Sequence, residues 1–240
     1  MAREVFDWSA LDRPTLYSIL NGARKHIVGK QLYIEEIHKI LSKQVKDYLP
    51  IRVKLLRSAD QEDGIIYIGG CYYGAEDKKN KDKHIEIVFS YFIWDQYLTI
   101  SAWRWKRMCE VFADTMLHEL IHMRQYRTRS FKVLPGYEST AYSAKLRKNQ
   151  NYYGHPDEIG AYAFNIACEM YERFGNDKKS VEKYMNSNQA NRHCRSTYLI
   201  YLKTFGHGHP VIKRLRRKVM FYLPYAEIGK PFKTSDYLTY

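Results

Sequence analysis

A segment in the middle of the chain, TMLHELIHMRQYR at residues 115–127, contains two histidines four positions apart. On an α-helix this spacing places His118 and His122 on one face about one turn apart, so both imidazoles can reach a single metal ion. Glu119 lies about 100° further round such a helix, near enough to contact a water on that ion without displacing a ligand. The segment therefore predicts a helix that carries half of a zinc site, with Glu119 as the catalytic residue.

The residues around this motif favour a long helix. Apolar side chains recur at helical intervals from Trp103 onward, and no glycine or proline interrupts the chain before Pro135 and Gly136. Within the motif, Leu117, Leu120 and Ile121 mark the side that faces the core. We therefore expect the two histidines to lie on a rigid element rather than in a loop.

A catalytic zinc normally takes three protein ligands, so the predicted site needs one further donor. Residues 152–175, YYGHPDEIGAYAFNIACEMYERFG, predict a second helix that starts near Pro156 and stops at Gly175. Glu158 projects from the start of this helix, and the small residues after it would allow close packing against the motif helix. We expect Glu158 to be the third ligand of one Zn²⁺ ion, with His155, an equally good zinc donor, as the alternative.

These two motifs resemble those of zinc metallopeptidases of the gluzincin type, in which H-E-x-x-H on one helix is completed by a glutamate on a later helix. The string EIGAYAF at 158–164 is similar to the corresponding helix of small phage-encoded metallopeptidases and of ImmA/IrrE-like regulators. The resemblance covers about residues 85–175 and departs from the pattern at Gly160, where such sequences often have Glu or Asn. It implies hydrolysis of peptide bonds in a protein or peptide substrate. A second resemblance, to SprT-like proteases, would make a histidine the third ligand, so His155 remains the alternative candidate for that ligand.

The expected ligand set assigns roles to several other residues. Zinc held by two imidazoles and a carboxylate lowers the pKa of its water toward about 7, and Glu119 would accept the proton and deliver it to the leaving amine. An oxyanion also needs a hydrogen-bond donor. The residues that could supply this donor are Tyr126, Tyr162 and His155, together with Tyr153, His193 and His207. Asp114, one turn before His118, either orients that imidazole or is a solvated helix acid.

The predicted fold class is α+β and zincin-like, with a small, mostly antiparallel sheet followed by the active-site helix and a helical C-terminal half. Alternating or branched residues predict strands at 51–55, 65–69 and 84–89, and the charged run at 75–83 predicts a hairpin loop. Peptidases that the chain resembles commonly bind an extended peptide at a sheet edge, and we expect capture at residues 84–89. Further helices are predicted at 14–28, 32–48, 180–185, 196–205 and 210–222.

The sequence shows no repeat and no linker, which predicts one zincin-like domain over residues 1–240. Within it we expect an N-terminal helical lobe at 1–50, the sheet and zinc-site helices at 51–175, and C-terminal helices at 176–240. The chain has no apolar run of membrane-spanning length and no signal-peptide core at its start, which predicts a cytoplasmic protein without a membrane partner, in the host cell if the chain is viral. The scattered cysteines Cys71, Cys109, Cys168 and Cys194 are typical of reduced thiols.

The chain is strongly basic, with 39 Lys and Arg against 26 Asp and Glu and a net charge of +13. Basic clusters attract polyanions, and the 22 tyrosines and 4 tryptophans could stack on bases. This composition indicates nucleic-acid binding without sequence preference, although a merely soluble basic face would look the same. The residues expected to bind nucleic acid are Lys213, Arg214, Arg216, Arg217 and Lys218.

Two classes of function remain open at this point. In the first, the chain is a zinc metalloendopeptidase, a hydrolase that cleaves a protein substrate. In the second, it is a basic nucleic-acid-binding or assembly protein whose metal site is structural or degenerate. Metal content and proteolysis separate the two classes.

Overall fold

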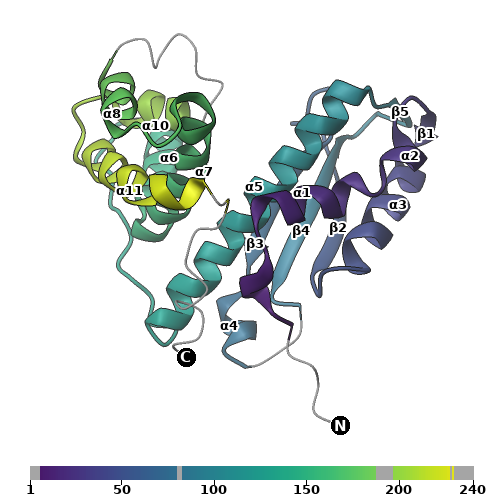
Figure 1. Ribbon diagram of the computed structural model, residues 1–240, viewed down its shortest axis with the longest axis horizontal. Coiled ribbons are helices and arrows are strands. Elements are labelled where there is room, and N and C mark those ends of the chain that lie inside the picture. The colour runs from purple at the N-terminus through teal and green to yellow at the C-terminus, as the bar shows by residue number, and fades with distance from the viewer. Residues whose placement is uncertain (1–5, 80–82, 188–196, 228, 230–240) are drawn as a thin grey trace. The chain divides into compact units, whose positions relative to one another are not determined.

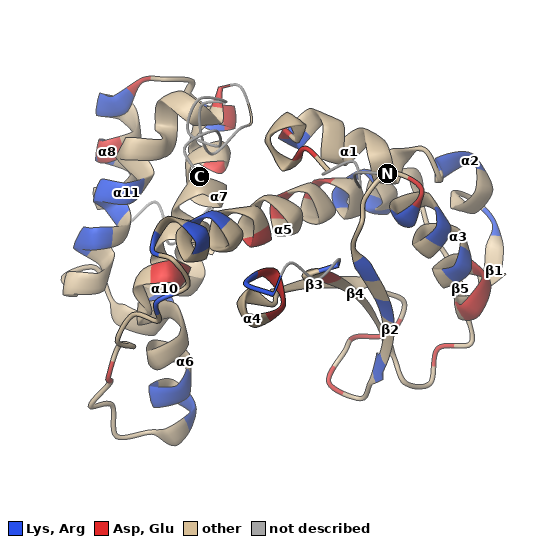
Figure 2. Cartoon of the chain, turned by 90° about the horizontal axis from the view of Figure 1, so that it is seen from below, with Lys and Arg blue, Asp and Glu red and all other residues tan. Residues whose placement is uncertain are grey.

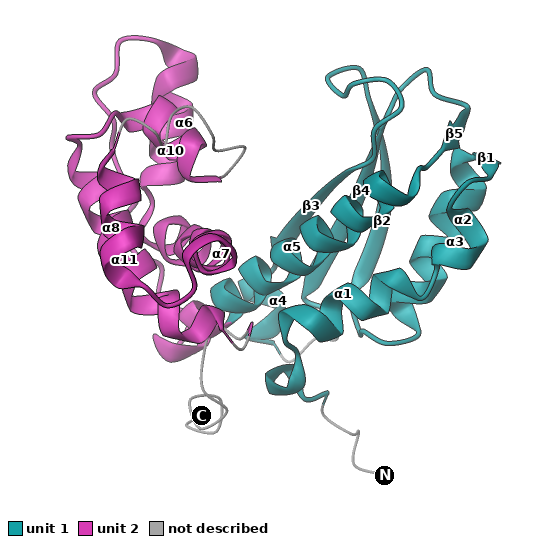
Figure 3. Ribbon diagram, turned by 45° about the horizontal axis from the view of Figure 1, so that its top comes forward, with its two compact units in different colours: residues 1–123 teal, residues 124–240 magenta. Residues whose placement is uncertain are grey.

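A computed structural model describes residues 6–79, 83–187, 197–227 and 229 of the 240-residue chain. The chain divides into two compact units, Met1–Met123 and Arg124–Tyr240 (Figure 3). The division falls inside the helix α5 (Ala102–Thr128), so it does not coincide with the lobe limits expected at residues 50 and 175. None of the described helices combines the length and the apolar character that crossing a bilayer requires.

The first unit is built on a three-stranded sheet (Figure 1). In the order β2-β4-β3, strand β2 runs parallel to β4 and β3 runs antiparallel to it, and β1 forms a separate antiparallel pair with β5. The chain is thus α+β as predicted, but its main sheet is mixed. Before α5, the elements of this unit are η1 (Trp8–Ala10), α1 (Arg13–Asn21), α2 (Arg24–Ile27), β1 (Gln31–Tyr33), α3 (Ile34–Lys46), β2 (Arg52–Ser58), β3 (Tyr67–Tyr72), α4 (Gly74–Asp77), β4 (Ile85–Phe92) and β5 (Tyr97–Thr99).

The strand predicted to capture a peptide lies in the centre of this sheet. Phe89 of β4 pairs with Leu55 of β2 on one side and with Ile68 of β3 on the other. The expectation of strand addition at residues 84–89 is therefore wrong, because both ladders of β4 are used within the sheet. Among the described strands β3 pairs with β4 only, so its second edge is available to an extended chain.

One face of the sheet is covered by α3 and α5 (Figure 2). His38 of α3 packs edge-on against Phe89 with ring centroids 6.3 Å apart, and Gly70 of β3, on the same face, lies against Glu119 of α5. Alternate side chains of β4 point into this layer and are fully buried. They are Ile85, Ile87, Phe89 and Tyr91.

The N-terminal helices differ from their predicted bounds for local reasons. The helix expected at 14–28 is divided into α1 and α2 at Gly22, where the Gln44 side chain occupies the space that a Cβ would need. The Gln44 amide also donates to the carbonyl of Ile19 at 2.9 Å. The helix expected from Leu32 begins two residues later, because Leu32 pairs with Leu98 in the β1–β5 ladder. The loop predicted at 75–83 overlaps α4, and its residues 80–82 lie outside the described part of the chain.

The second unit consists of helices arranged around α7. As predicted, α7 begins at Pro156 and ends before Gly175, whose φ of 59° suits a glycine. The helix α6 was not predicted, because its sequence has no apolar stripe and only Gly154 in it is buried. The described helices of this unit after α5 are α6 (Ala144–Gly154), α7 (Pro156–Phe174), α8 (Lys178–Asn186), α10 (Thr197–Phe205) and α11 (Pro210–Ala226).

Candidate metal centre

The two histidines of the H-E-x-x-H motif face each other on α5. Their Nε2 atoms are 3.0 Å apart, and their rings are nearly perpendicular at 79°. Nitrogen lone pairs at this distance repel unless a proton or a cation lies between them. Two nitrogen ligands of one tetrahedral zinc lie about 3.3 Å apart. The pair formed by His118, which is 6% exposed, and the half-buried His122 therefore has the spacing of two ligands on one ion.

Glu119 is buried against the edge strand β3. Only 5% of Glu119 is exposed, and a Cβ on Gly70 would lie 2.7 Å from its Oε1 atom. The same Cβ would lie 2.8 Å from Cγ2 of Thr115, so only glycine fits at this point of the strand. Burial raises the pKa of the neighbouring Cys71 thiol, and the charge of Glu119 adds to this shift. The residue predicted as general base thus lies beside the sheet edge that remains open.

An apolar groove of about 330 Å³ lies at the start of this edge strand, between residues 64–68 and the first half of α5. Arg104 and Arg107 also line it, and Trp103 in its wall is 67% exposed. Since the groove and Gly70 share one strand, a chain segment paired with β3 would pass both. The apolar lining consists of Ile65, Ile66, Ile68, Ile100, Met108 and Val111 together with Trp103.

The start of α7, which carries Glu158, is attached to the last turns of α5. The Arg129 guanidinium donates to both carboxylate oxygens of Asp157 at 2.6 Å, and the Gln125 amide donates to the Asp157 carbonyl at 3.0 Å. Asp157 raises the pKa of Arg129 through these bonds. His155 is the N-cap, and its Nδ1 accepts from the Asp157 N–H at 3.2 Å. The alternative ligand therefore already has a structural role in starting the helix.

The sequence did not lead us to predict that Gln125 and Arg129 hold the start of α7 through Asp157. Gln125 follows His122 at three positions, on the helix face of the two histidines, and Arg129 follows it at seven positions, just after the end of α5. This spacing was the available signal. The Gln125 amide also occupies the place that a Cβ of Gly160 would take. Gly160 is the position at which the sequence departs from the gluzincin-type pattern. The close approach of α7 to the end of α5 explains why a glycine stands there.

Tyrosines surround Glu158 within the helical unit. The hydroxyls of Tyr152 and Tyr162 are 3.3 Å apart, and the rings of Tyr153 and Tyr162 both pack against Tyr201. Burial raises the pKa of Tyr152, and the charges of Tyr162 and Glu158 raise it further. A phenol with a raised pKa keeps its proton near neutral pH and can donate a hydrogen bond, which is the chemistry predicted for Tyr162. Tyr152 offers the same chemistry and was missed.

Other residues singled out in the sequence have structural contacts. The Tyr126 ring lies 4.4 Å from the guanidinium carbon of Arg129, in a cation–π contact. Asp114 accepts from Nε of Arg13 at 2.7 Å, and Nδ1 of His207 lies 3.1 Å from a guanidinium nitrogen of Arg216. Two further residues, His193 and Cys194, lie outside the described part of the chain.

The basic residues predicted to bind nucleic acid lie on α11 but have different environments. Arg216 donates to the Tyr198 hydroxyl and the Met185 carbonyl, both at 2.8 Å, and therefore joins α11 to the segments around it. The remaining four basic side chains are exposed: Lys213, Arg214, Arg217 and Lys218.

The described residues thus present two facing imidazoles, a buried glutamate at an open sheet edge, and a carboxylate at the start of a helix anchored to the end of α5. All four groups carry the donor or proton-transfer chemistry that a catalytic zinc site uses. No protein-family model, curated protein or solved structure matches the chain.

Proposed function

We propose that the chain is a zincin-like, zinc-dependent metalloendopeptidase in which His118, His122 and Glu158 hold one Zn²⁺ ion. Two imidazoles and one carboxylate form a group that could hold a metal, and this donor set is found at catalytic zinc. The observation that carries the proposal is the approach of the two Nε2 atoms to 3.0 Å on a helix that also presents Glu119.

The attachment of α7 supports Glu158 as the third ligand. Gln125 in the last turns of α5 and Arg129 just after its end hold Asp157, the neighbour of Glu158. The Nδ1 atom of His155, by contrast, is engaged in capping α7. We therefore favour the carboxylate of Glu158 over the imidazole of His155.

Glu119 supplies the proton transfer in the proposed reaction. When bound, zinc would act as a Lewis acid that lowers the pKa of a water toward about 7. The Glu119 carboxylate accepts the proton of that water, keeps it in a buried position, and delivers it to the leaving amine of the peptide. General acid–base catalysis of this kind contributes about 10²- to 10⁴-fold to a rate. Gly70 keeps the space into which Glu119 projects.

The proposed substrate is an extended peptide that adds to the second edge of β3. Strand addition uses backbone hydrogen bonds for affinity and side-chain pockets for specificity. The apolar groove beside β3 would accept one large apolar side chain of the peptide, and Gly70 further along the strand would bring the backbone next to Glu119. This proposal replaces the expectation of peptide capture on β4.

The catalytic role is tested with Glu119→Gln. We expect the variant to retain one zinc per chain by elemental analysis and to lose at least about 100-fold in kcat/KM on an unfolded protein such as casein. Wild-type protein that has been stripped with a chelator and reloaded with zinc is the control for recovery of activity. Cleavage by Glu119→Gln at the wild-type rate would refute the proposal. Zinc retention without proteolysis in either protein would favour a structural or degenerate site.

The third ligand is tested by comparing Glu158→Ala with His155→Asn. Asparagine is a good N-cap, so His155→Asn removes the imidazole while keeping the start of α7. We expect Glu158→Ala to weaken zinc binding in a competition titration with a chromophoric chelator, and His155→Asn to bind zinc like the wild type. The reverse order of affinities would make His155 the ligand.

A further inference from the structure

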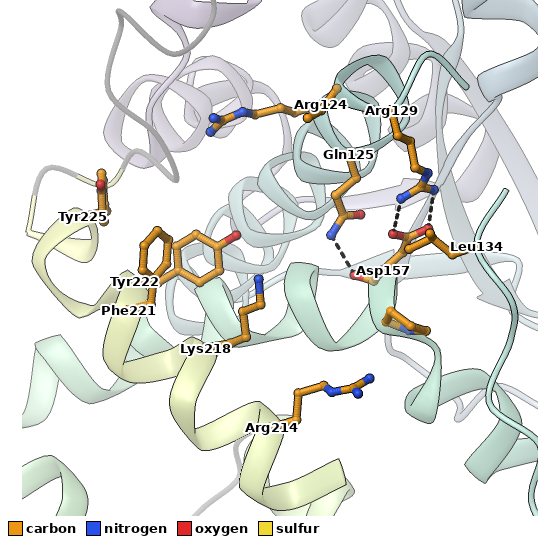
Figure 4. A pocket seen from close by; sticks show the side chains of 12 residues that line it. Arg124, Gln125, Arg129, Leu134, Asp157, Arg214, Lys218, Phe221, Tyr222 and Tyr225 are labelled. Carbon is orange, nitrogen blue, oxygen red and sulfur yellow. Dashed lines mark hydrogen bonds and ion pairs between the residues drawn. The ribbon is translucent and has the colours of Figure 1, made fainter. Parts of the chain in front are cut away.

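The second unit contains an open pocket of about 570 Å³ between α11, the end of α5 and the start of α7 (Figure 4). Four of its lining residues are basic and one is acidic, so its lining has an excess of three positive charges. The acid, Asp157, is paired with Arg129, as Figure 4 shows. The basic residues are Arg124, Arg129, Arg214 and Lys218.

Two of these cations have no anionic partner in the described structure. Arg214 and Lys218 are exposed, and within the described residues no carboxylate pairs with either of them. They are four positions apart on α11, a helix that contains no Asp or Glu, and its Lys and Arg residues are seen in Figure 2. Their charges can therefore be neutralised by an anion that enters the pocket.

Aromatic rings continue the same face of α11. Phe221 and Tyr225 follow Lys218 at three and seven positions, and their ring centroids are 5.7 Å apart. Phe221 is 57% exposed although it lines the pocket, so its ring is accessible to a planar group. Tyr222 beside it is buried, which raises its pKa to about 12, and Arg124 is close enough to oppose that shift. The pocket thus combines free positive charge with an accessible aromatic ring.

We propose that this pocket binds a nucleotide unit of single-stranded nucleic acid. Arg214 and Lys218 contact the phosphate, with the charge of Arg124 nearby, and Phe221 stacks on the base. Every base has a flat face, so stacking on one ring predicts binding without sequence preference. A duplex keeps its bases stacked within the helix, so it offers phosphates to this pocket but no base. The Arg129–Asp157 pair and Arg216 serve as fixed supports and do not bind the strand.

The test measures the affinity of the full-length protein for a labelled oligothymidine of twelve nucleotides by fluorescence anisotropy, between 50 and 200 mM salt. We expect the double variant Arg214→Ala/Lys218→Ala to weaken binding at least about 10-fold. The slope of log affinity against log salt should fall by about 1.4, which is the value for two phosphate contacts on a single strand. The matched control is Lys213→Ala/Arg217→Ala, which removes the same charge from exposed positions of the same helix outside the pocket. We expect less than about a 3-fold change for this control.

Stacking is tested with Phe221→Ala, which should weaken binding of the oligothymidine about 10-fold and leave binding of an abasic strand of equal length unchanged. Three results would overturn the proposal: an equal loss of affinity in the two double variants, an equal effect of Phe221→Ala on both strands, or no binding by the wild type. Displacement of the strand by micromolar AMP would identify a free nucleotide as the ligand, and tight binding of polyglutamate would reduce the site to a general anion surface. Binding by Glu119→Gln at wild-type strength separates this inference from the proposed peptidase activity.

Discussion

The contact between Gly70 and Glu119 links one residue of the edge strand to the proposed chemistry. The Glu119 side chain occupies the space above Gly70, so the strand approaches α5 more closely than any residue with a Cβ would allow. Its neighbour Gly69 has nothing within 4 Å of an added Cβ. These adjacent glycines have different environments because consecutive strand residues point to opposite faces of the sheet.

Gly70→Ala should therefore displace the Glu119 carboxylate and lower kcat by about 100-fold, the size of effect expected when a catalytic group moves by about 1 Å. Zinc content should stay at one per chain, because the three atoms nearest to the added methyl group belong to Glu119 and Thr115 and not to the proposed ligands. The measurement is steady-state peptide hydrolysis, with Gly69→Ala as the matched control at near wild-type rates. A fully active Gly70→Ala would show that Glu119 need not hold its observed position.

The attachment of α7 to the end of α5 depends on one buried ion pair. The Arg129 and Asp157 side chains are 16% and 6% exposed, and the carboxylate accepts two hydrogen bonds from one guanidinium. Such a bidentate pair fixes both the distance and the angle between the two helical segments. Removing one partner leaves the other buried with an uncompensated charge, which is more costly than removing both.

Asp157→Ala should lower the free energy of unfolding by about 3 kcal/mol in a denaturant titration. The double variant Arg129→Met/Asp157→Leu should recover most of this loss, because two apolar side chains leave no unpaired charge. Glu110→Ala, which removes the surface ion pairs of Glu110 with Lys106 and Arg107 within α5, should change stability by less than about 0.5 kcal/mol. Equal losses for Asp157→Ala and Glu110→Ala would contradict a special role of the buried pair.

Bound zinc should stabilise the folded chain, because the proposed ligands come from two helices that are separate in the sequence. A ligand present at about 1,000 times its dissociation constant stabilises the folded state by about 4 kcal/mol. Removing zinc with a chelator should lower Tm by several degrees, measured by calorimetry, and adding zinc should restore it. His122→Ala should show the low Tm with or without zinc. An equal response of this variant to zinc would place the ion elsewhere.

The helices that carry the candidate site could be predicted from local sequence. The bounds of α7 follow from Pro156 at its start and Gly175 after its end, and α5 follows from a long apolar period without a breaker. The facing of His118 and His122 also follows from helical periodicity, since it depends on residues four positions apart. Local backbone preference and side-chain spacing are sufficient for features of this kind.

Contacts between distant residues could not be predicted in this way. The position of β4 in the middle of the sheet, the approach of Gly70 to Glu119, and the pairing of Arg129 with Asp157 all depend on which faces and edges meet when the chain folds. Alternating apolar and polar residues indicate a strand but do not show which strands it pairs with. Likewise, the run of basic residues on α11 does not show which of their side chains line a pocket. Packing therefore decided which strand edge stays unpaired among the described strands and which cations line the pocket, because both depend on distances set by residues far apart in the sequence.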